Sequence, residues 1–192
     1  MSQQPTVIIL AGGLSTRFRA SAGKLDKLNA QICGKRVIDH VIDAVRATKL
    51  PFYVVKRKHI EHLTNPGMGD SIAHGVAATP NSAGWLILPA DLPLIQPSTL
   101  IAVANALLEH PIVMPEYRGQ RGHPVGFQAF LGTHLKELHG DQGAKSIVKK
   151  YATHHLDVSD EGATLDVDTV EQLAHAEFLI WARLDNSKHM PK

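Results

Sequence analysis

The sequence predicts an α/β protein built on a parallel β-sheet, and three almost wholly apolar runs at 6–10, 52–55 and 85–88 carry that prediction. Apolar runs without alternating polar residues are typical of strands that are covered on both faces. A helical pattern of apolar residues lies between the first two runs, at 35–47. Strand, helix and strand in this order form the βαβ unit of a parallel sheet.

The other elements follow from the same patterns along the chain. Apolar residues at helical spacing predict helices, and a Ser, Thr or Asp just before them predicts where each helix begins. In order, we expect a short helix through 72–76 opened by Asp70 or Ser71, a helix over 98–110 capped by Ser98, a strand at 111–114, a helix over 130–138, a further helix after 145, a strand at 155–158, and a last helix over 170–184 opened by a Thr169–Gln172 capping box.

Size and composition limit the class of protein. The 192 residues, 44% of them hydrophobic, suit a single domain over 1–192 with a polar tail at 185–192. The formal charge of +2 is not the basic excess of duplex DNA-binding proteins, and no apolar run approaches the roughly 20 residues of a membrane span. We therefore expect no nucleic-acid partner and no membrane partner.

The N-terminus lacks the basic start and apolar core of a signal peptide, and the chain has one cysteine, Cys33. One thiol cannot form an internal disulfide, so a cytoplasmic location is expected. We predict that Cys33 is a small buried hydrophobe.

The first apolar run ends in a glycine loop, Gly12–Gly13, which Ser15 and Arg17 follow. Two glycines let the backbone approach a ligand closely, consecutive N–H groups can face an anion, and the guanidinium of Arg17 suits phosphate. An ordinary turn is an equally good interpretation of this stretch alone, because short glycine motifs also match by chance.

Three later stretches carry groups that can contact a ligand, and each also has a plain structural interpretation. They are the polar stretch 18–28 with Lys24 and Lys27, the glycine–proline loop 64–75 with Ser71, and the glycine-rich hairpin region 116–127 with Arg118, Arg121 and His123. Lysines, helix N-termini and clustered cations can bind phosphates or acidic substrates. The alternatives are a solvated loop, a capped turn and a solvated hairpin tip.

Carboxylates at two places suggest a metal site. Asp91 lies just past the third apolar run, and ligands of open α/β sheets bind outside the carboxyl ends of strands. A carboxylate between prolines favours a Mg²⁺ ligand over a turn cap. Asp166 and Asp168 point to one face if their segment is extended, where like charges repel unless a cation lies between them. Two solvated or capping carboxylates are the alternative.

Taken in order along the chain, these stretches resemble the motifs of the MobA-like nucleotidyltransferases, and more closely those of their molybdenum cofactor cytidylyltransferase branch. The matching pieces span nearly the whole chain: Leu10-Ala-Gly-Gly-x-Ser-x-Arg17, Lys27-Leu28 ahead of Gly34-Lys35, Gly67-Met-Gly-x-Ser71, Leu88-Pro-Ala-Asp-Leu-Pro93, Gly122-His-Pro-Val125, Gly140-Asp-Gln-Gly-Ala144 and Asp166-Val-Asp-Thr169. Each piece alone is weak, whereas seven in this order are specific.

The resemblance implies a Rossmann-like three-layer α/β/α sandwich with a mostly parallel sheet. It implies a Mg²⁺-dependent enzyme that transfers CMP or GMP from CTP or GTP to the terminal phosphate of a molybdopterin-type acceptor and releases pyrophosphate. A molybdoenzyme or maturation protein is then a candidate partner. The alternatives are a related transferase acting on a sugar or polyol phosphate, and a non-catalytic nucleotide-binding homologue.

The resemblance also assigns roles to residues. Arg17 and Lys27 would be catalytic, His123 and Asp141 would bind the acceptor, and Asp91 and Asp168 would bind Mg²⁺, with Asp166 as the alternative to Asp168. The nucleotide would be held by Leu10, Ala11, Gly12, Gly13, Ser15, Arg17, Lys27, Ser71 and Asp91.

Departures from the family pattern leave two choices open. Lys24-Leu25 duplicates Lys27-Leu28, and the distance to Gly34-Lys35 favours Lys27 as the phosphate ligand. Ala11-Gly12-Gly13 resembles the guanylyl-transferring branch, whereas the motifs that end at Ser71 and Thr169 resemble the cytidylyl branch. On balance the motifs favour CTP.

Overall fold

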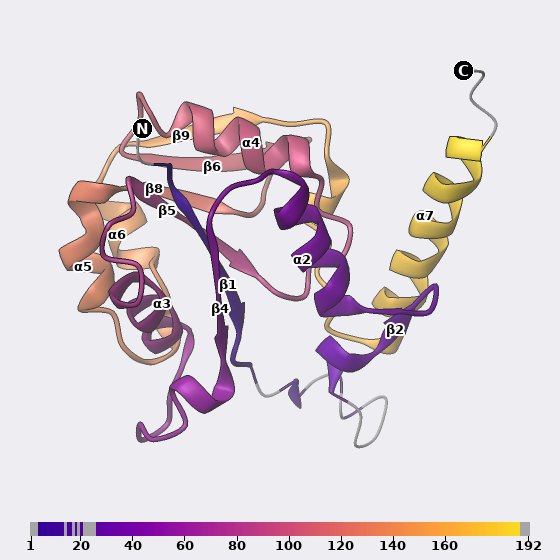
Figure 1. Ribbon diagram of the computed structural model, residues 1–192, viewed down its shortest axis with the longest axis horizontal. Coiled ribbons are helices and arrows are strands. Elements are labelled where there is room, and N and C mark those ends of the chain that lie inside the picture. Colours follow the sequence, from indigo (N-terminus) through magenta and orange to yellow (C-terminus); the bar gives the residue numbers. More distant parts are fainter. Residues whose placement is uncertain (1–3, 14, 17, 19, 21–25, 189–192) are drawn as a thin grey trace.

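The computed structural model of the chain describes residues 4–13, 15–16, 18, 20 and 26–188 (Figure 1). Seven strands of this described part form one sheet in the order β4-β1-β5-β8-β6-β7, with β9 also paired to β6. They are β1 (Thr6–Ala11), β4 (Phe52–Lys56), β5 (Gly84–Pro89), β6 (Ile112–Tyr117), β7 (Gln120–Arg121), β8 (Val125–Gln128) and β9 (Thr153–Asp157).

Most of the sheet runs in one direction. β1 is parallel to both β4 and β5, so that Ile8 aligns with Tyr53 on one side and Ile87 on the other. β8 is antiparallel to β5 and β6, while β9 is parallel to β6 and β7 is antiparallel to it. β4, β1, β5, β6 and β9 therefore share a direction, which confirms the mostly parallel sheet.

Helices cover both faces of the sheet. α2 (Val37–Ala47) and α4 (Pro97–Ala106) pack on one face, and α3 (Met68–Ala77), α5 (Gly132–Lys136) and α6 (Lys145–Lys150) pack on the other (Figure 1). Within β1, Val7 and Ile9 face the first layer, Ile8 faces the second, and all three are fully buried. Burial on both faces explains why the strand carries no polar alternation, and it confirms the three-layer α/β/α sandwich.

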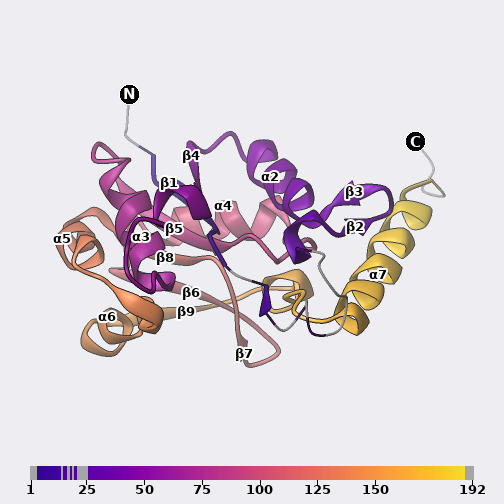
Figure 2. The same ribbon diagram turned by 90° about the horizontal axis from the view of Figure 1, so that it is seen from below.

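The last helix, α7 (Val170–Lys188), lies away from the sheet, beside the small hairpin of β2 (Gln31–Ile32) and β3 (Lys35–Arg36) (Figure 2). The predicted capping box opens it: Gln172 accepts from the Thr169 N–H at 2.9 Å, and the Thr169 hydroxyl accepts from the Gln172 N–H at 3.3 Å. The helix continues through Lys188, so the first part of the predicted tail is helical. Among the described residues, every helix is too short or too polar to cross a bilayer.

Cys33 is exposed, so the prediction that it is buried was wrong. It lies in the turn of the β2–β3 hairpin, where Cys33 and Gly34 have φ angles of +49° and +78°. Tight hairpin turns require positive φ at such positions and leave their side chains in solvent. The local sequence shows no Asn-Gly or Asp-Gly signal that would have identified this turn.

The start of α4 also differs from its prediction, because Ser98 does not cap it. α4 begins at Pro97, and its first turn is held by Asp160, a side chain only 2% exposed. The Asp160 carboxylate accepts from the Gln96 N–H at 2.9 Å and from the Thr99 hydroxyl at 2.8 Å. This cap comes from more than 60 residues away along the chain, which no local pattern reveals.

Other helix boundaries also moved. The helix expected over 35–47 begins at Val37, because Lys35–Arg36 form β3, and the helix expected to open at Asp70 or Ser71 begins at Met68. The helix expected to run to 110 ends at Ala106, and the helix expected over 130–138 is divided into a 3₁₀ turn, η3 (Ala129–Leu131), and α5.

Candidate active site

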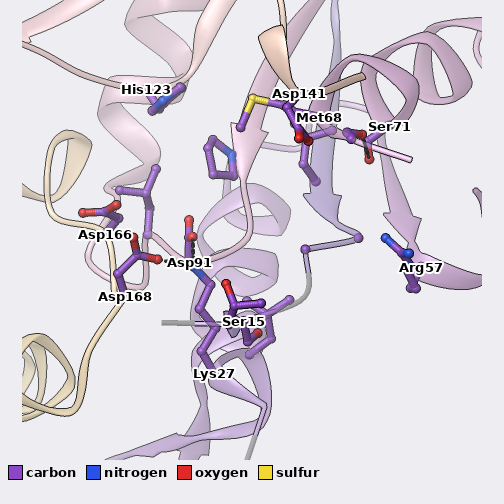
Figure 3. A pocket seen from close by; sticks show the side chains of 18 of the residues that line it. Ser15, Lys27, Arg57, Met68, Ser71, Asp91, His123, Asp141, Asp166 and Asp168 are labelled. Atoms are coloured by element: carbon purple, nitrogen blue, oxygen red, sulfur yellow. Dashed lines mark hydrogen bonds and ion pairs between the residues drawn. The ribbon is translucent and has the colours of Figure 1, made fainter. Parts of the chain in front are cut away.

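A cleft of about 720 Å³ opens at the carboxyl ends of β1, β4 and β5 (Figure 3). This is the edge at which open α/β sheets bind ligands. Segments from the whole length of the chain line it: the loop after β1, the 3₁₀ turns η1 (Lys27–Asn29), η2 (Arg57–His59), η4 (Gly140–Gln142) and η5 (Glu161–Ala163), the start of α3, the loop after β5, the β7–β8 connection and the segment before α7.

The structure brings most of the predicted site residues together in this cleft. The lining residues include Leu10, Gly12, Gly13, Ser15, Lys27, Ser71, Asp91, His123, Asp141 and Asp168. Ala11 is not among them, since it packs against the core on the α2 side. Arg17 and Lys24 lie outside the described residues, so the predictions made for them stay predictions.

The most strongly charged part of the cleft is an ion cluster formed by Lys27, Asp91 and Asp168. The Lys27 Nζ lies 2.5 Å from Asp91 Oδ2 and 2.6 Å from Asp168 Oδ1 (Figure 3). The three side chains are 13%, 17% and 21% exposed, respectively. One ammonium group therefore joins two carboxylates that are largely withdrawn from water.

A backbone hydrogen bond positions the segment that carries Asp166 and Asp168. The Val167 N–H donates to the Asp91 carbonyl at 2.9 Å, which holds this segment beside the loop that follows β5. Val167 is fully buried in an apolar cluster that includes Phe18 and Leu94, whereas Asp166 and Asp168 both line the cleft. The prediction that these two aspartates share a face is confirmed.

The pKa shifts of the cleft follow from its crowding. Burial acts to lower the pKa of Lys27, but the charge of Asp91 and the hydrogen bonds to Asp168 and Asp91 outweigh it and raise the pKa above its ordinary value. Burial and the negative charges of Asp91 and Asp168 raise the pKa of the Asp166 carboxyl. Asp166 is thus partly withdrawn from water and lies near two other carboxylates.

His123 lies at the other end of the cleft, where burial lowers the pKa of its imidazole. Its Nδ1 is buried and has no hydrogen-bond partner among the described residues. The backbone N–H of His123 donates to the Ala163 carbonyl at 2.8 Å, which joins the β7–β8 connection to the segment that carries Asp166 and Asp168. His123 is therefore a neutral side chain held in a fixed place.

The glycine loop passes close to α3. A Cβ on Gly12 would lie 3.2 Å from Ile60 Cδ1 and 3.3 Å from the Ser71 hydroxyl, whereas a Cβ on Gly13 would meet nothing within 4 Å. Ser15, with a φ of +54°, has a buried hydroxyl without a hydrogen-bond partner in the described part of the chain. The close approach at Gly12 supports the interpretation that this loop is more than an ordinary turn.

The start of α3 is tied to η4 through Asp70. The Asp70 carboxylate accepts from the Gly67 N–H at 2.8 Å and from the Gly140 N–H at 2.9 Å. A Cβ on Gly67 would collide with the backbone of Gly140 and with the Asp141 carboxylate, so only glycine permits this contact. The two glycine motifs thus pack against each other, and they bring Met68 and Asp141 together at the cleft (Figure 3).

Sequence reasoning missed Arg57, which lines the cleft from the first turn after β4 (Figure 3). Its position directly after the carboxyl end of a parallel strand was the available signal. Of the cations expected in the hairpin region, Arg121 lines the cleft, whereas Arg118 does not: it lies at the turn with a φ of +51°, over the Tyr117 ring. Arg118 is therefore not placed to contact a ligand of this cleft.

The carboxylates of the cleft suit a hard divalent cation. Asp91 Oδ1 is buried and lacks a hydrogen-bond partner among the described residues, and burial together with the charges of Asp91 and Asp168 raises the pKa of Asp166. Within the same described residues, no group of three His, Cys, Asp or Glu side chains is arranged to hold an ion by itself. Mg²⁺ sites commonly use only one or two protein carboxylates and take their other ligands from water and substrate phosphates.

Sequence comparison places these features in a known family. The model of the MobA-like NTP transferase domain matches residues 7–156. Among individual relatives, the bifunctional protein GlmU of Desulfitobacterium hafniense is 29% identical over 161 residues, which cover 76% of this chain and 34% of that protein. The chain therefore spans about a third of the length of this relative.

Solved structures share the fold. Rv0371c of Mycobacterium tuberculosis in complex with manganese has 22% identity and a TM-score of 0.68, covering 90% of this chain and 97% of that one. Molybdopterin-guanine dinucleotide biosynthesis protein A of Archaeoglobus fulgidus has 14% identity and a TM-score of 0.63, covering 92% and 99%. The 4-diphosphocytidyl-2C-methyl-D-erythritol synthase of Anaerococcus prevotii has 15% identity and a TM-score of 0.70, covering 93% and 99%.

The contact between α3 and η4 leads to a first prediction. Gly67→Ala should lower the free energy of unfolding by about 1–3 kcal/mol, because the added methyl group meets backbone rather than a flexible side chain. Urea unfolding followed by circular dichroism measures this. Gly13→Ala is the matched control and should change the free energy by less than about 0.5 kcal/mol, since its Cβ meets open space. Equal stabilities of the two variants would contradict the packing described.

Burial of His123 leads to a second prediction. Its pKa is lower in the folded chain than the ordinary value of 6.5, so the unfolded chain takes up the proton first as the pH falls. His123 therefore favours folding above about pH 6.5, and this contribution is lost as the pH falls toward the folded pKa. His123→Gln, which does not titrate, should lose less stability than the wild type between pH 7 and pH 5.

Urea unfolding at several pH values measures this difference. His175→Gln, at an exposed position of α7, is the matched control and should follow the wild type. If His123→Gln shows the same pH dependence of stability as the wild type, then burial of a neutral His123 imidazole does not contribute to that dependence, and the prediction is wrong.

Proposed function

Because this chain belongs to the MobA-like NTP transferase family, we propose that it transfers CMP or GMP from an NTP to the terminal phosphate of a molybdopterin-type acceptor and releases pyrophosphate. The observation that carries this proposal is the ion cluster of Lys27, Asp91 and Asp168, in one cleft with the glycine loop. A polyanionic substrate with a divalent cation suits that combination of groups. The family match supports nucleotidyl transfer, whereas the identity of the acceptor is part of the proposal.

Asp91 and Asp168 are the residues that would hold Mg²⁺, with Asp166 beside them. The Mg²⁺ would offset the negative charge that gathers on the triphosphate during transfer. The manganese complex of Rv0371c supports a divalent cation in this fold, and oxygen ligands alone are consistent with either metal.

The acceptor phosphate requires no general base. A phosphate monoester has a second pKa of about 6 and is largely ionised at neutral pH, so it can attack the α-phosphorus directly. The chain must then hold two anions in line and compensate their charges. Lys27 and the N–H groups of the glycine loop supply positive charge, and neutral His123 contributes a hydrogen-bonding group rather than a proton acceptor for the attack.

The two ends of the cleft suggest where the substrates lie. Ser71 and Arg57 line the end next to the glycine loop, which we assign to the nucleoside (Figure 3). His123, Asp141 and Arg121 line other parts of the cleft, which we assign to the acceptor. Arg17, predicted to contact the triphosphate, keeps that role in the proposal.

Two solved structures bear on the choice of substrates. The protein from Archaeoglobus fulgidus is described as acting in molybdopterin-guanine dinucleotide biosynthesis, which supports a molybdopterin acceptor. The Anaerococcus prevotii enzyme is described as a diphosphocytidyl-methylerythritol synthase, which supports cytidylyl transfer and favours a polyol phosphate as the second candidate acceptor. For the nucleotide we favour CTP, on the motifs that end at Ser71 and Thr169.

A pyrophosphate-release assay tests the proposal. The chain is incubated with Mg²⁺ and each of CTP, GTP, ATP and UTP, with molybdenum cofactor, with a polyol phosphate, or without acceptor. Release that requires molybdenum cofactor and is fastest with CTP or GTP is the expected result. Release with the polyol phosphate alone would favour the second candidate, and no release under any condition would contradict a transferase.

The metal ligand gives a third prediction. Asp91→Ala should lower the rate of pyrophosphate release by at least about 100-fold, because it removes a carboxylate that compensates charge through the metal. Circular dichroism should show an intact fold, since Asp168 still pairs with Lys27. Asp43→Ala, which removes an exposed carboxylate of α2, is the control and should keep the wild-type rate. Near-normal kinetics of Asp91→Ala would exclude this residue as the metal ligand.

A further inference from the structure

The segment 160–168 carries Asp166 and Asp168 to the cleft, where Figure 3 shows them beside Asp91. At its start lies Asp160, which is only 2% exposed and does not itself line the cleft. A buried carboxylate is unfavourable unless its oxygens accept hydrogen bonds. The donors to Asp160 therefore show what this carboxylate holds together.

Four donors from two parts of the chain converge on the Asp160 carboxylate. Its Oδ2 accepts from the Gln96 N–H at 2.9 Å and from the Thr99 hydroxyl at 2.8 Å, and both donors belong to the start of α4. Its Oδ1 accepts from the Gln96 side-chain amide at 3.2 Å and from the Gly162 N–H of η5 at 2.9 Å. One carboxylate thus joins the end of the loop after β5 to the segment 160–168.

The loop after β5 and the segment 160–168 meet again on the way to the cleft. A Cβ on Gly162 would collide with the Leu94 carbonyl, so only glycine permits this close packing. In order along the chain, the contacts join Asp160 to Gln96, Gly162 to Leu94 and Val167 to Asp91. The two segments therefore run side by side in opposite directions, and Asp160 closes the end that lies outside the cleft.

Building on the proposed function, we infer that Asp160 is a positioning residue for the proposed metal site. By joining the two segments outside the cleft, it keeps Asp168 close to Asp91, although like charges repel. An amide could not replace the carboxylate, because an amide accepts through one oxygen only and would leave two of the four donors without an acceptor. Asp160 acts through the backbone of 160–168, since it does not line the cleft.

A role confined to α4 is the alternative, and the two roles differ in what loosens when Asp160 is lost. If Asp160 only caps α4, its loss loosens the first turn of that helix. If it positions the cleft carboxylates, its loss also loosens the hydrogen bond from the Val167 N–H to the Asp91 carbonyl, seven residues further along the segment. Amide hydrogen exchange reports the opening of each region separately.

Amide exchange of Asp160→Asn, measured by NMR without nucleotide or metal, tests the inference. The Val167 amide should exchange at least tenfold faster than in the wild type, relative to the fully buried Val113 of β6, which reports global unfolding. Ser82→Ala is the matched control, because it removes a hydroxyl that accepts from the Thr6 N–H at 2.9 Å, at the amino end of β1 and away from the cleft. That variant should keep the wild-type ratio of the two exchange rates.

A second pair of variants decides the question if Asp160→Asn does not fold. Thr99→Val removes one donor to Asp160 and should speed the exchange of Val167 at least threefold relative to Val113, whereas Thr99→Ser keeps the hydroxyl and should match the wild type. A Val167 amide that follows Val113 in Asp160→Asn, or in Thr99→Val if the first variant is unfolded, would overturn the inference, because Asp160 would then only cap α4.

The pyrophosphate-release assay adds a second readout. Asp160→Asn should raise the Mg²⁺ concentration required for half the maximal rate at least fivefold, whereas Ser82→Ala should leave it unchanged. An unchanged Mg²⁺ requirement of Asp160→Asn in an active chain would overturn the inference.

The exchange experiment uses no nucleotide, metal or acceptor, which separates it from the test of the proposed function. A chain without transferase activity can still show the loosening at Val167, and an active transferase can lack it. The two hypotheses therefore fail on different measurements.

Discussion

Compensation of negative charge at one point is the constraint on which the cleft depends. Asp91, Asp166 and Asp168 line one part of it, Asp141 lines another, and the Lys27 ammonium joins Asp91 and Asp168. Lys27 is 64 residues from Asp91 and 141 residues from Asp168, so this contact joins three distant parts of the chain just past the carboxyl end of β5. Without a cation at that point, repulsion among largely buried carboxylates would work against the assembled site.

Backbone hydrogen bonds hold the segment that carries Asp166 and Asp168 next to Asp91. The Val167 N–H donates to the Asp91 carbonyl, and the His123 N–H donates to the Ala163 carbonyl. Just before these contacts in the chain, buried Asp160 holds the first turn of α4. The segment 160–168 is thus held at several points by the start of α4, the β7–β8 connection and the loop after β5, although it contains no strand. A site that must tolerate like charges at short range requires this rigidity, because a flexible segment would relax away from the charge.

The sequence predicted what local patterns encode and missed what distant partners decide. Strands such as β1 were found because burial on both faces leaves an unbroken apolar run, and the glycine stretches marked close backbone contacts such as the one at Gly67. Ser98 and Cys33 were misjudged because a distant carboxylate caps α4 and a hairpin turn exposes the thiol. The position of Lys27 within a polar stretch suggested a phosphate ligand, but nothing nearby in the sequence indicated its two carboxylate partners.

The negative charge shared by all phosphorylated acceptors also limits which residues can determine substrate selectivity. Any acceptor with a terminal phosphate presents similar negative charge to Lys27 and the carboxylates, so the ion cluster offers little means of telling a molybdopterin from a polyol phosphate. Discrimination must then come from groups that contact the rest of the acceptor, and His123, Asp141 and Arg121 line the cleft outside the cluster. His123 is neutral and fixed, which suits hydrogen-bonding recognition. Chemistry and selectivity would thus be carried by different parts of one cleft, and acceptors could differ among proteins that share the ion cluster.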